Sequence, residues 1–311
     1  MKKNILLILI CMGCLKASPG TSYQYGYSAR SVSLSSAMVA DTYHTLQSFS
    51  NPALLNQCTG QNYAISYFVM SLDRSLQTFY YSRKLAGNAG LSAAILRTSV
   101  GKFMGKDYFN NPTNELSNSD YYGLLSFGLG SKKGSGIGIS MRIHYSNLYV
   151  NESHIDKYTG TSITVDFGGV YSMNSKIRLG FKIQNFFNPY INWDVNRGDG
   201  LSHKYDESYP LIVSIGSRVK LWEQSNFLIQ KDLYFLNTNN KSYKDFFKLG
   251  YEHFIYDVIA LRIGIQTEKK LSLGFGYKFN INQLPLSLDY AVDLGSENEG
   301  VSHLFTWSVG L

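Results

Sequence analysis

The side chains that could carry out chemistry are spread thinly along this chain of 311 residues. Its six histidines are His44, His144, His154, His203, His253 and His303. None of them forms a His-Glu-x-x-His pair, and none stands near cysteines at the spacing of a zinc site. No Gly-x-Ser-x-Gly segment precedes a helical pattern, so a strained nucleophilic serine is not indicated either. The sequence therefore predicts a protein that is not an enzyme and that needs no metal and no cofactor.

Two short runs imitate ligand sites. Residues 134–138 are rich in glycine, but they lack the Gly-Lys-Ser/Thr ending of a phosphate loop and run into a predicted strand. Residues 194–199 contain two aspartates and suggest calcium, but the acids do not follow the spacing of a calcium loop and no bidentate glutamate closes it. We interpret the first run as turn and strand glycines and the second as an outer loop.

The elements that must position any functional side chain are strands. Residues 271–281 are apolar at every odd position and small or polar at every even position. This is the period-two pattern of a strand with one apolar and one polar face. Similar runs of about ten residues recur from Gln61 to the end, with aromatic residues near their ends. Runs of this length can cross a bilayer at a tilt.

About fourteen such strands can be parsed. Long polar links (102–118, 148–158 and 188–208) alternate with short ones (86–88, 131–134, 173–175, 221–224 and 281–283), as in barrels with long outer loops and short periplasmic turns. The last strand alternates up to Leu311 and resembles the C-terminal signal read by the outer-membrane assembly machinery. We predict an all-β fold: an antiparallel outer-membrane β-barrel of about fourteen strands, in the bacterial cell outer membrane, with lipid as its surroundings.

Charged residues on the polar faces of the strands should point into the barrel, because a charge on the lipid face costs about 2–4 kcal/mol at the bilayer midplane. The predicted inward set is Arg142, His144, Asp166, Arg178, Lys182, Arg218, Lys248, Glu252, Arg262, Lys278, Asp289 and Asp293. Two interpretations are open. The set can form paired networks that fill the lumen, which we prefer, or some members can bind the polar end of an amphiphilic ligand.

The N-terminus is typical of an exported protein. Lys2 and Lys3, an apolar core and then small residues predict a signal peptide over 1–17, with lipoprotein processing at Cys14 as the alternative. Its removal takes away three lysines and no acid, so the formal charge falls from +7 to +4, too mild to indicate nucleic acid. Cys58 is then the one cysteine of the mature chain, which excludes an internal disulfide.

Residues 18–60 do not alternate and precede the barrel, 61–311. Within them, Ala29-Arg30, the run 34–41 and Asn51-Pro52-Ala53-Leu54-Leu55 resemble the opening of the fatty-acid-transporter-like (FadL-like) barrels. Weaker strand matches follow at 166–171, 179–186 and 288–291. The branch that this pattern resembles most is the PorV/PorQ family, which is associated with type IX secretion.

This resemblance implies a small N-terminal hatch in the lumen of a fourteen-stranded barrel. In the PorV/PorQ-like branch it implies docking or shuttling of secreted cargo at the cell surface, with secretion-system components and cargo proteins as partners. The alternative is a FadL-like passive transporter of long-chain fatty acids or other hydrophobic small molecules. The hatch residues that match are Ala29, Arg30, Asn51, Pro52 and Ala53. Ser35-Ser36 in place of the usual glycine pair and Leu54 in place of glycine depart from the pattern.

Overall fold

The computed structural model describes residues 26–42, 44–71, 73–106, 109–131, 133–150, 156–188, 190–196, 202–235, 243–267, 270–295 and 300–311. The predicted signal peptide and the alternative processing site at Cys14 lie outside these residues. Among the described residues, helical structure is confined to short segments, none of them long and apolar enough to cross a membrane.

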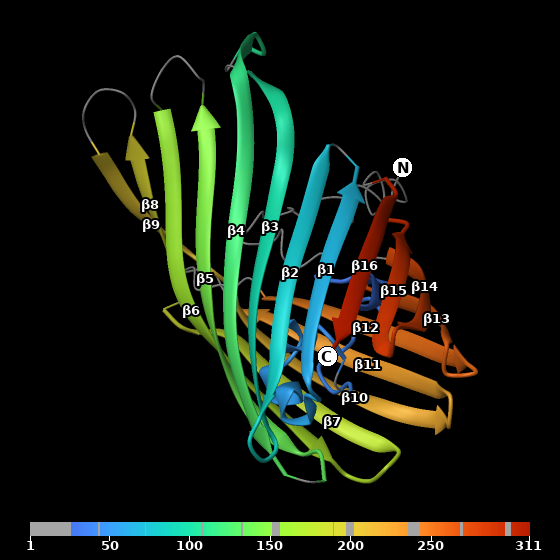
Figure 1. Ribbon diagram of the computed structural model, residues 1–311. Helices are drawn as coiled ribbons and strands as arrows, with labels where there is room; N and C mark the ends of the chain where they lie inside the picture. The colour runs from blue at the N-terminus through green and yellow to red at the C-terminus, as the bar shows by residue number, and fades with distance from the viewer. Residues whose placement is uncertain are drawn as a thin grey trace, which may run out of the picture.

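Fourteen antiparallel strands close into a barrel, as the alternation predicts (Figure 1). The first six are β1 (Gln61–Met70), β2 (Arg74–Leu85), β3 (Ala89–Lys106), β4 (Pro112–Gly130), β5 (Gly136–Val150) and β6 (Asp156–Ser172). The next four are β7 (Ile177–Phe187), β10 (Leu211–Trp222), β11 (Ser225–Phe235) and β12 (Tyr243–Ile255). The last four are β13 (Ile259–Gln266), β14 (Lys270–Ile281), β15 (Leu284–Asp293) and β16 (Ser302–Gly310). The pairing of β1 with β16 and of β5 with β6 joins the ends of the sheet.

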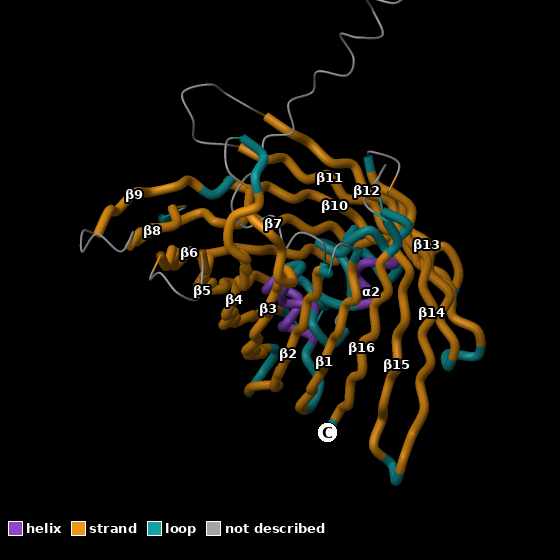
Figure 2. The backbone as a smooth tube through the Cα atoms, turned by 90° about the horizontal axis from the view of Figure 1, so that it is seen from above, coloured by secondary structure: helices purple, strands orange, loops and turns teal. Residues whose placement is uncertain are grey.

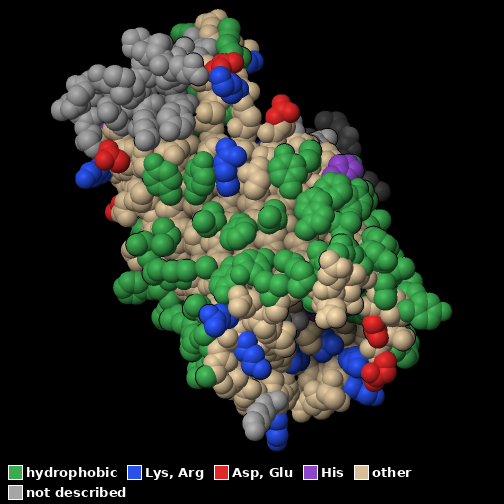
Figure 3. All heavy atoms as spheres, viewed as in Figure 1, with side chains coloured by type: hydrophobic (Ala, Val, Ile, Leu, Met, Phe, Trp, Pro, Cys, Tyr) green, Lys and Arg blue, Asp and Glu red, His purple; other side chains and the backbone are tan. Residues whose placement is uncertain are grey.

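The outer face of the wall is apolar. In β5, Ile137, Ile139, Met141 and Ile143 are all more than a third exposed, whereas the alternate residues Ser140 and Arg142 are buried. The other strands repeat this alternation, and their outward side chains form a hydrophobic belt across the middle of the molecule (Figure 3). A barrel that turns its apolar side chains outward is built for lipid, since an aqueous protein would bury them.

The wall is taller on one side, and here the predicted loops are wrong. Much of 102–118 and 148–158 belongs to β3–β6, and 188–208 contains a hairpin of β8 (Tyr190–Asn196) and β9 (Ser202–Ser208). The hairpin pairs with the upper part of β6 and ends the sheet at β9, beside the tall strands (Figures 1 and 2). Backbone ladders continue beyond the apolar belt in segments where the alternation is broken, as at the adjacent Phe103 and Met104, or short, as in the seven residues of β8.

The N-terminal segment from Gly26 to Gly60 lies within the ring of strands (Figure 2). It contains the helix α2 (Ala29–Ser33) and two 3-10 turns, η2 (Gln47–Phe49) and η3 (Pro52–Gln57). A capping box between Ser28 and Ser31 begins α2, and the Asn51 side chain accepts from the Ala53 N–H to begin η3, with proline at its first position. We call Gly26–Gly60 the plug. Hydrogen bonds between residues three to five apart, such as Val32 N–H to Ser28 and Asn51 N–H to Gln47, shape its described backbone.

Candidate functional site in the barrel lumen

Glycines on the inner face of the wall allow the plug to pack closely against the strands. A Cβ added at Gly138 would lie 2.5 Å from the Ala53 backbone nitrogen, and one at Gly128 would lie 2.5 Å from the Pro52 carbonyl oxygen. Gly264 faces the Ser35 backbone nitrogen in the same way, also at 2.5 Å. The register places Gly90, Gly128, Gly138 and Gly168 side by side across four strands. This row of glycines forms a flat surface against which η3 packs. The wall therefore accepts the plug's backbone at closer range than any side chain would allow.

Asn51, Pro52 and Ala53 are structural residues at this contact between η3 and the wall. The Asn51 amide donates to the carbonyl oxygens of Val39 (2.7 Å) within the plug and of Gly169 (3.1 Å) and Phe181 (3.2 Å) in the wall. Its oxygen accepts from the Ala53 N–H at 3.0 Å. All three residues are buried, with Asn51 and Ala53 fully inaccessible. They fix the path of η3 and connect it to β6 and β7.

Arg30 joins the plug to the opposite wall. Its guanidinium binds the Asp41 carboxylate at 2.6 Å within the plug and both oxygens of Glu252 on β12, at 2.9 and 2.8 Å. Arg262 on β13 binds the same Glu252 at 2.7 Å and Asp289 on β15 at 2.6 Å. The result is an ion-pair chain, Asp41–Arg30–Glu252–Arg262–Asp289, that runs from the plug into three wall strands. The N–H of the neighbouring residue Ala29 donates to the Thr306 hydroxyl of β16 at 2.8 Å, which adds a hydrogen bond between the plug and the wall.

The plug's ionisable groups reflect this burial. Burial opposes the charge of Arg30, but Asp41 and Glu252 outweigh it and raise the pKa of Arg30 above its ordinary value. Burial pushes the pKa of Asp41 upward, and the adjacent Arg30 charge overcomes that and lowers it. Burial, together with the Arg30 charge, lowers the pKa of His44 to about 3. The plug therefore holds a permanent ion pair and a neutral histidine.

A second polar cluster lies where β6 and β7 separate. Between the pairs Val165–Phe187 and Phe167–Ile183, three residues of β7 stand opposite the single residue Asp166. Asn185 has a left-handed backbone (φ 58°), and its N–H donates to Asp166 at 3.0 Å in place of a ladder bond. Arg142 binds the other oxygen of Asp166 at 2.6 Å. This wide bulge weakens the wall's backbone pairing at one level and replaces it with buried side-chain bonds.

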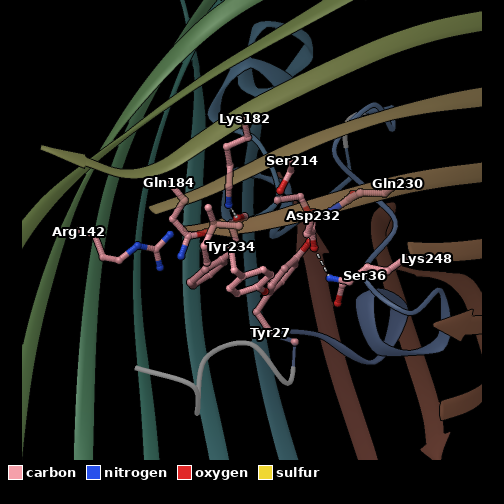
Figure 4. Close-up of a pocket in the computed structure, with 14 residues that line it drawn as sticks. Tyr27, Ser36, Arg142, Lys182, Gln184, Ser214, Gln230, Asp232, Tyr234 and Lys248 are labelled. Carbon is pink, nitrogen blue, oxygen red and sulfur yellow. Dashed lines mark hydrogen bonds and ion pairs between the residues drawn. The ribbon is translucent and has the colours of Figure 1, made fainter. Parts of the chain in front are cut away.

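A cavity of about 80 Å³ lies between this cluster and the plug (Figure 4). Arg142 and Gln184 approach it from one side and Gln230 and Lys248 from the other, with Tyr27 below. Tyr27 stacks on Phe49, with ring centroids 4.9 Å apart, and the two rings form an apolar floor. Lys248 is paired with Asp232 at 2.6 Å, whereas the Lys182 ammonium donates to the Phe49 carbonyl oxygen at 3.0 Å. The cavity thus combines an aromatic floor with a buried ammonium group.

The remaining predicted inward residues also face the lumen, but they do not form one site. His144 stacks on Tyr122 with ring centroids 4.3 Å apart and belongs to the wall beside β4. Arg178 lies at the short-turn end, where it donates to the Asp41 carbonyl oxygen at 2.8 Å. Of the predicted inward set, Arg142, Asp166, Lys182 and Lys248 lie at or near the cavity, and Glu252, Arg262 and Asp289 belong to the ion-pair chain, together with the predicted hatch residue Arg30. Among the described residues, no group of three or more histidines, cysteines or acids could hold a metal.

Sequence reasoning did not single out Tyr27, Phe49, Asp41 or Asn185. Asp41 stood within the run that resembles the family opening, and Asn185 preceded a predicted long loop. The aromatic floor had no periodic signal, because the plug is neither a regular helix nor a strand.

Comparison with solved structures shows the same fold. The toluene transporter TodX of P. putida superposes with a TM-score of 0.65 at 11% identity, over 93% of this chain and 99% of that one. The monoaromatic hydrocarbon channel CymD gives a TM-score of 0.62 at 10% identity, over 92% of this chain and 97% of that one. A Pseudomonas aeruginosa FadL homologue gives 0.60 at 10% identity, over 91% and 97%. No protein-family model and no curated protein matches the sequence.

These structures are FadL-type outer-membrane barrels, described as transporters and channels, and this chain shares their architecture along almost its whole length. The resemblance to FadL-like barrels is therefore supported at the level of the fold. The narrower relation to the PorV/PorQ family stays a prediction.

Proposed function

We propose that this protein is a passive outer-membrane conduit for small hydrophobic or amphiphilic molecules. The observation that carries the proposal is the cavity above the Tyr27–Phe49 floor, which lies inside a barrel of the same fold as hydrocarbon channels. A conduit needs no nucleophile, metal or cofactor, since it lowers a permeation barrier and makes no bonds.

The cavity indicates an amphiphile rather than a pure hydrocarbon. Lys182 is buried and donates to the backbone carbonyl oxygen of Phe49, which leaves its charge available to an incoming carboxylate or similar polar end. The aromatic floor and Ile212 can receive an apolar portion. At about 80 Å³ the cavity is smaller than an apolar cavity of about 150 Å³ that accepts benzene, so a guest must displace side chains to enter.

The wide bulge between β6 and β7 offers the side on which the cavity can open. Gln184 lies in the bulge, lines the cavity and is the last residue of β7 paired with β10, so a shift of this segment changes the cavity and disturbs only the terminal pair of that ladder. The plug, in contrast, is fixed by ion pairs and by close packing of its backbone against glycines of the wall. We therefore place the movement that admits a guest in the bulge and its side chains.

Uptake into liposomes tests this function. The purified barrel is reconstituted, and entry of a medium-chain fatty acid and of toluene is followed with Lys182→Met and Phe49→Ala beside the wild type. We expect both variants to slow fatty-acid entry several-fold, with toluene affected only by Phe49→Ala. A matched control is Lys231→Met, an exposed lysine of β11 whose loss should leave both rates unchanged. Entry no faster than in empty liposomes would overturn the proposal.

Docking of secreted cargo is the second candidate, because of one feature of the outer end. β3–β6 and the β8–β9 hairpin rise above the rest of the wall, and β9 ends the sheet with an unpaired edge among the described strands (Figure 1). Such an edge can pair with an extended segment of another protein. Recovery of secreted proteins with the barrel from its own cells, without a bound lipid or hydrocarbon, would favour this function over the conduit.

A further inference from the structure

The short-turn end of the barrel is basic. Lysine and arginine side chains gather beneath the hydrophobic belt at the end where β2–β3, β4–β5 and β6–β7 are joined by tight turns (Figure 3). An open cavity of about 340 Å³ lies there, between the end of η3 and the turn residues Asn88, Ser131, Lys133 and Gly134. We call it the basic cavity. It lies away from the aromatic floor and shares no lining residue with the cavity described above.

The charges that line the basic cavity have one sign. Lys84, Lys133 and Arg178 line it, and no acidic side chain does so among the described residues. The Arg178 guanidinium donates to three neutral groups: the Asp41 carbonyl oxygen (2.8 Å), the Gln57 side-chain oxygen (3.0 Å) and the Ser172 hydroxyl (3.2 Å). The Asp41 carboxylate, which is nearby, is already bound by Arg30 and Gln47.

The wall adds a further positive charge behind Arg178. Arg218 on β10 is its direct cross-strand partner, and Arg218 donates to the neutral Asn226 side chain at 2.6 Å. Like charges directly opposite each other on neighbouring strands are destabilising. Arg178 lines the cavity with two lysines and has a second arginine beside it in the wall, so the site has an excess of positive charge that an anion would neutralise.

The polar framework of the basic cavity is held in place before any ligand arrives. The Asn56 amide donates to the carbonyl oxygens of Gly134 (3.2 Å) and Ser135 (3.0 Å), and the Gln57 amide donates to Gly134 at 3.2 Å. These bonds fix the turn, in which Gly134 has a φ of 84°. A Cβ at Gly134 would lie 2.6 Å from the Gln57 nitrogen and 3.0 Å from an Arg178 nitrogen, so glycine keeps this floor open. Lys84 and Lys133 stand exposed at the rim.

We propose that the basic cavity binds a phosphate-bearing ligand. Three cations suit a group with three or more acceptor oxygens and more than one negative charge, better than they suit a single carboxylate. A volume of about 340 Å³ accepts a phosphate with a small polar substituent such as glycerol, near the lower limit of small-molecule sites. The ligand is either a lipid headgroup or a soluble phosphate ester, which present the same chemistry. This inference does not depend on the conduit.

Binding to the full-chain protein, purified in a neutral detergent, tests the proposal. The soluble probe is glycerol 1-phosphate, followed by calorimetry. The lipid probe is a short-chain phosphatidic acid, a phosphate monoester like glycerol 1-phosphate, followed by native mass spectrometry against the matching diacylglycerol, which lacks the phosphate. The cavity variant is Lys84→Gln/Lys133→Gln. The control is Lys176→Gln/Lys220→Gln, which removes the same charge at the same end but from outside the cavity.

We expect the wild type and the control to bind alike and the cavity variant to bind about tenfold more weakly or worse, because removal of a charged donor weakens charge-assisted bonds. Binding of glycerol 1-phosphate identifies a soluble ester as the source, and binding of phosphatidic acid alone identifies a lipid headgroup; either supports the site. Equal weakening in the control would show only surface electrostatics and overturn the proposal. So would the absence of binding by the wild type at millimolar probe.

Discussion

Arg30 is the residue through which the plug and the wall depend on each other. Its guanidinium binds one carboxylate from each, Asp41 and Glu252, and all three side chains are buried. A buried ion pair adds little net stability when it is intact, but the loss of one partner leaves a charge without compensation. This asymmetry makes Arg30 a sensitive position in spite of its distance from the cavity floor.

Arg30→Met should therefore lower the free energy of unfolding by about 3–5 kcal/mol. Glu252 keeps Arg262, and Asp41 keeps the Gln47 amide, but neither replaces the lost charge for Asp41. Urea unfolding of the detergent-folded barrel, followed by tryptophan fluorescence, measures the loss. Lys231→Met removes an exposed pair with Asp245 and should cost less than about 1 kcal/mol. Similar losses in both variants would contradict this account of Arg30.

His44 should make the plug sensitive to mild acid. Its pKa in the folded protein is lowered to about 3, by burial first and by Arg30 next, whereas in the unfolded chain it is about 6.5. Between these values the unfolded chain binds a proton that the folded protein does not, so stability falls as the pH falls through this window. We expect the urea midpoint to drop from pH 7.5 to pH 4.5, and to drop less in His44→Gln. An identical drop in both proteins would assign the effect to other groups.

At the scale of elements, the fit between η3 and the wall rests on glycine. Gly138→Ala places a methyl group against the backbone of Pro52 and Ala53, which cannot rotate away as a side chain could. We expect a loss of about 1–3 kcal/mol and faster proteolysis within the plug, since overpacking forces the backbone to shift. Gly123→Ala on β4 is the matched control, because its added Cβ would meet only Ile143 at 3.7 Å. Equal behaviour of the two variants would show that this contact is not tight.

The elements that the sequence predicts well are those that cross the apolar belt. The alternation at 271–281 predicts a strand, and β14 covers Lys270–Ile281 with Leu273, Phe275 and Tyr277 outward. Strands β8 and β9 were missed. β8 does alternate, with Ile191, Trp193 and Val195 between polar neighbours, but its seven residues are shorter than the runs of about ten that identify the membrane-crossing strands, and β9 (SHKYDES) has no apolar period. Their existence depends on pairing with β6, a long-range contact that no local pattern contains.

The candidate site was predictable only in part, for the same reason. Inward orientation follows from the period of a strand, which is why Arg142, Asp166 and Lys182 could be placed in the lumen. The pairing of Arg30 with Glu252 could not, since it joins residues 222 positions apart and requires the register of the closed barrel. The bulge at Asn185 could not be predicted either, because the left-handed backbone of an asparagine does not change the hydrophobic pattern of the sequence.

At the scale of the whole molecule, the plug and the two cavities divide the lumen. The ion-pair chain holds the plug against β12, β13 and β15, on the side away from the bulge between β6 and β7. The cavity above the aromatic floor lies between the plug and β7, β10 and β11, where the plug has fewer charged contacts. On the β7 side the described residues of the plug are held by the neutral hydrogen bonds of Asn51 and not by ion pairs, so we propose that a guest passes beside the plug there while the ion-pair chain anchors it on the other side.

A disulfide between the plug and β12 tests this division. A Cβ at Gly250 would lie 3.1 Å from the Leu34 Cβ, so Leu34→Cys with Gly250→Cys needs a shift of a few tenths of an ångström to reach bonding geometry. In a Cys58→Ser background, the oxidised protein has a plug that cannot leave the wall. We expect liposome uptake of a medium-chain fatty acid to stay within about twofold of the reduced protein, because the anchored side already carries the plug's ion pairs. Uptake that stops on oxidation and returns on reduction would instead mean that the plug itself must move, and the route would then run through the centre of the barrel rather than beside β7.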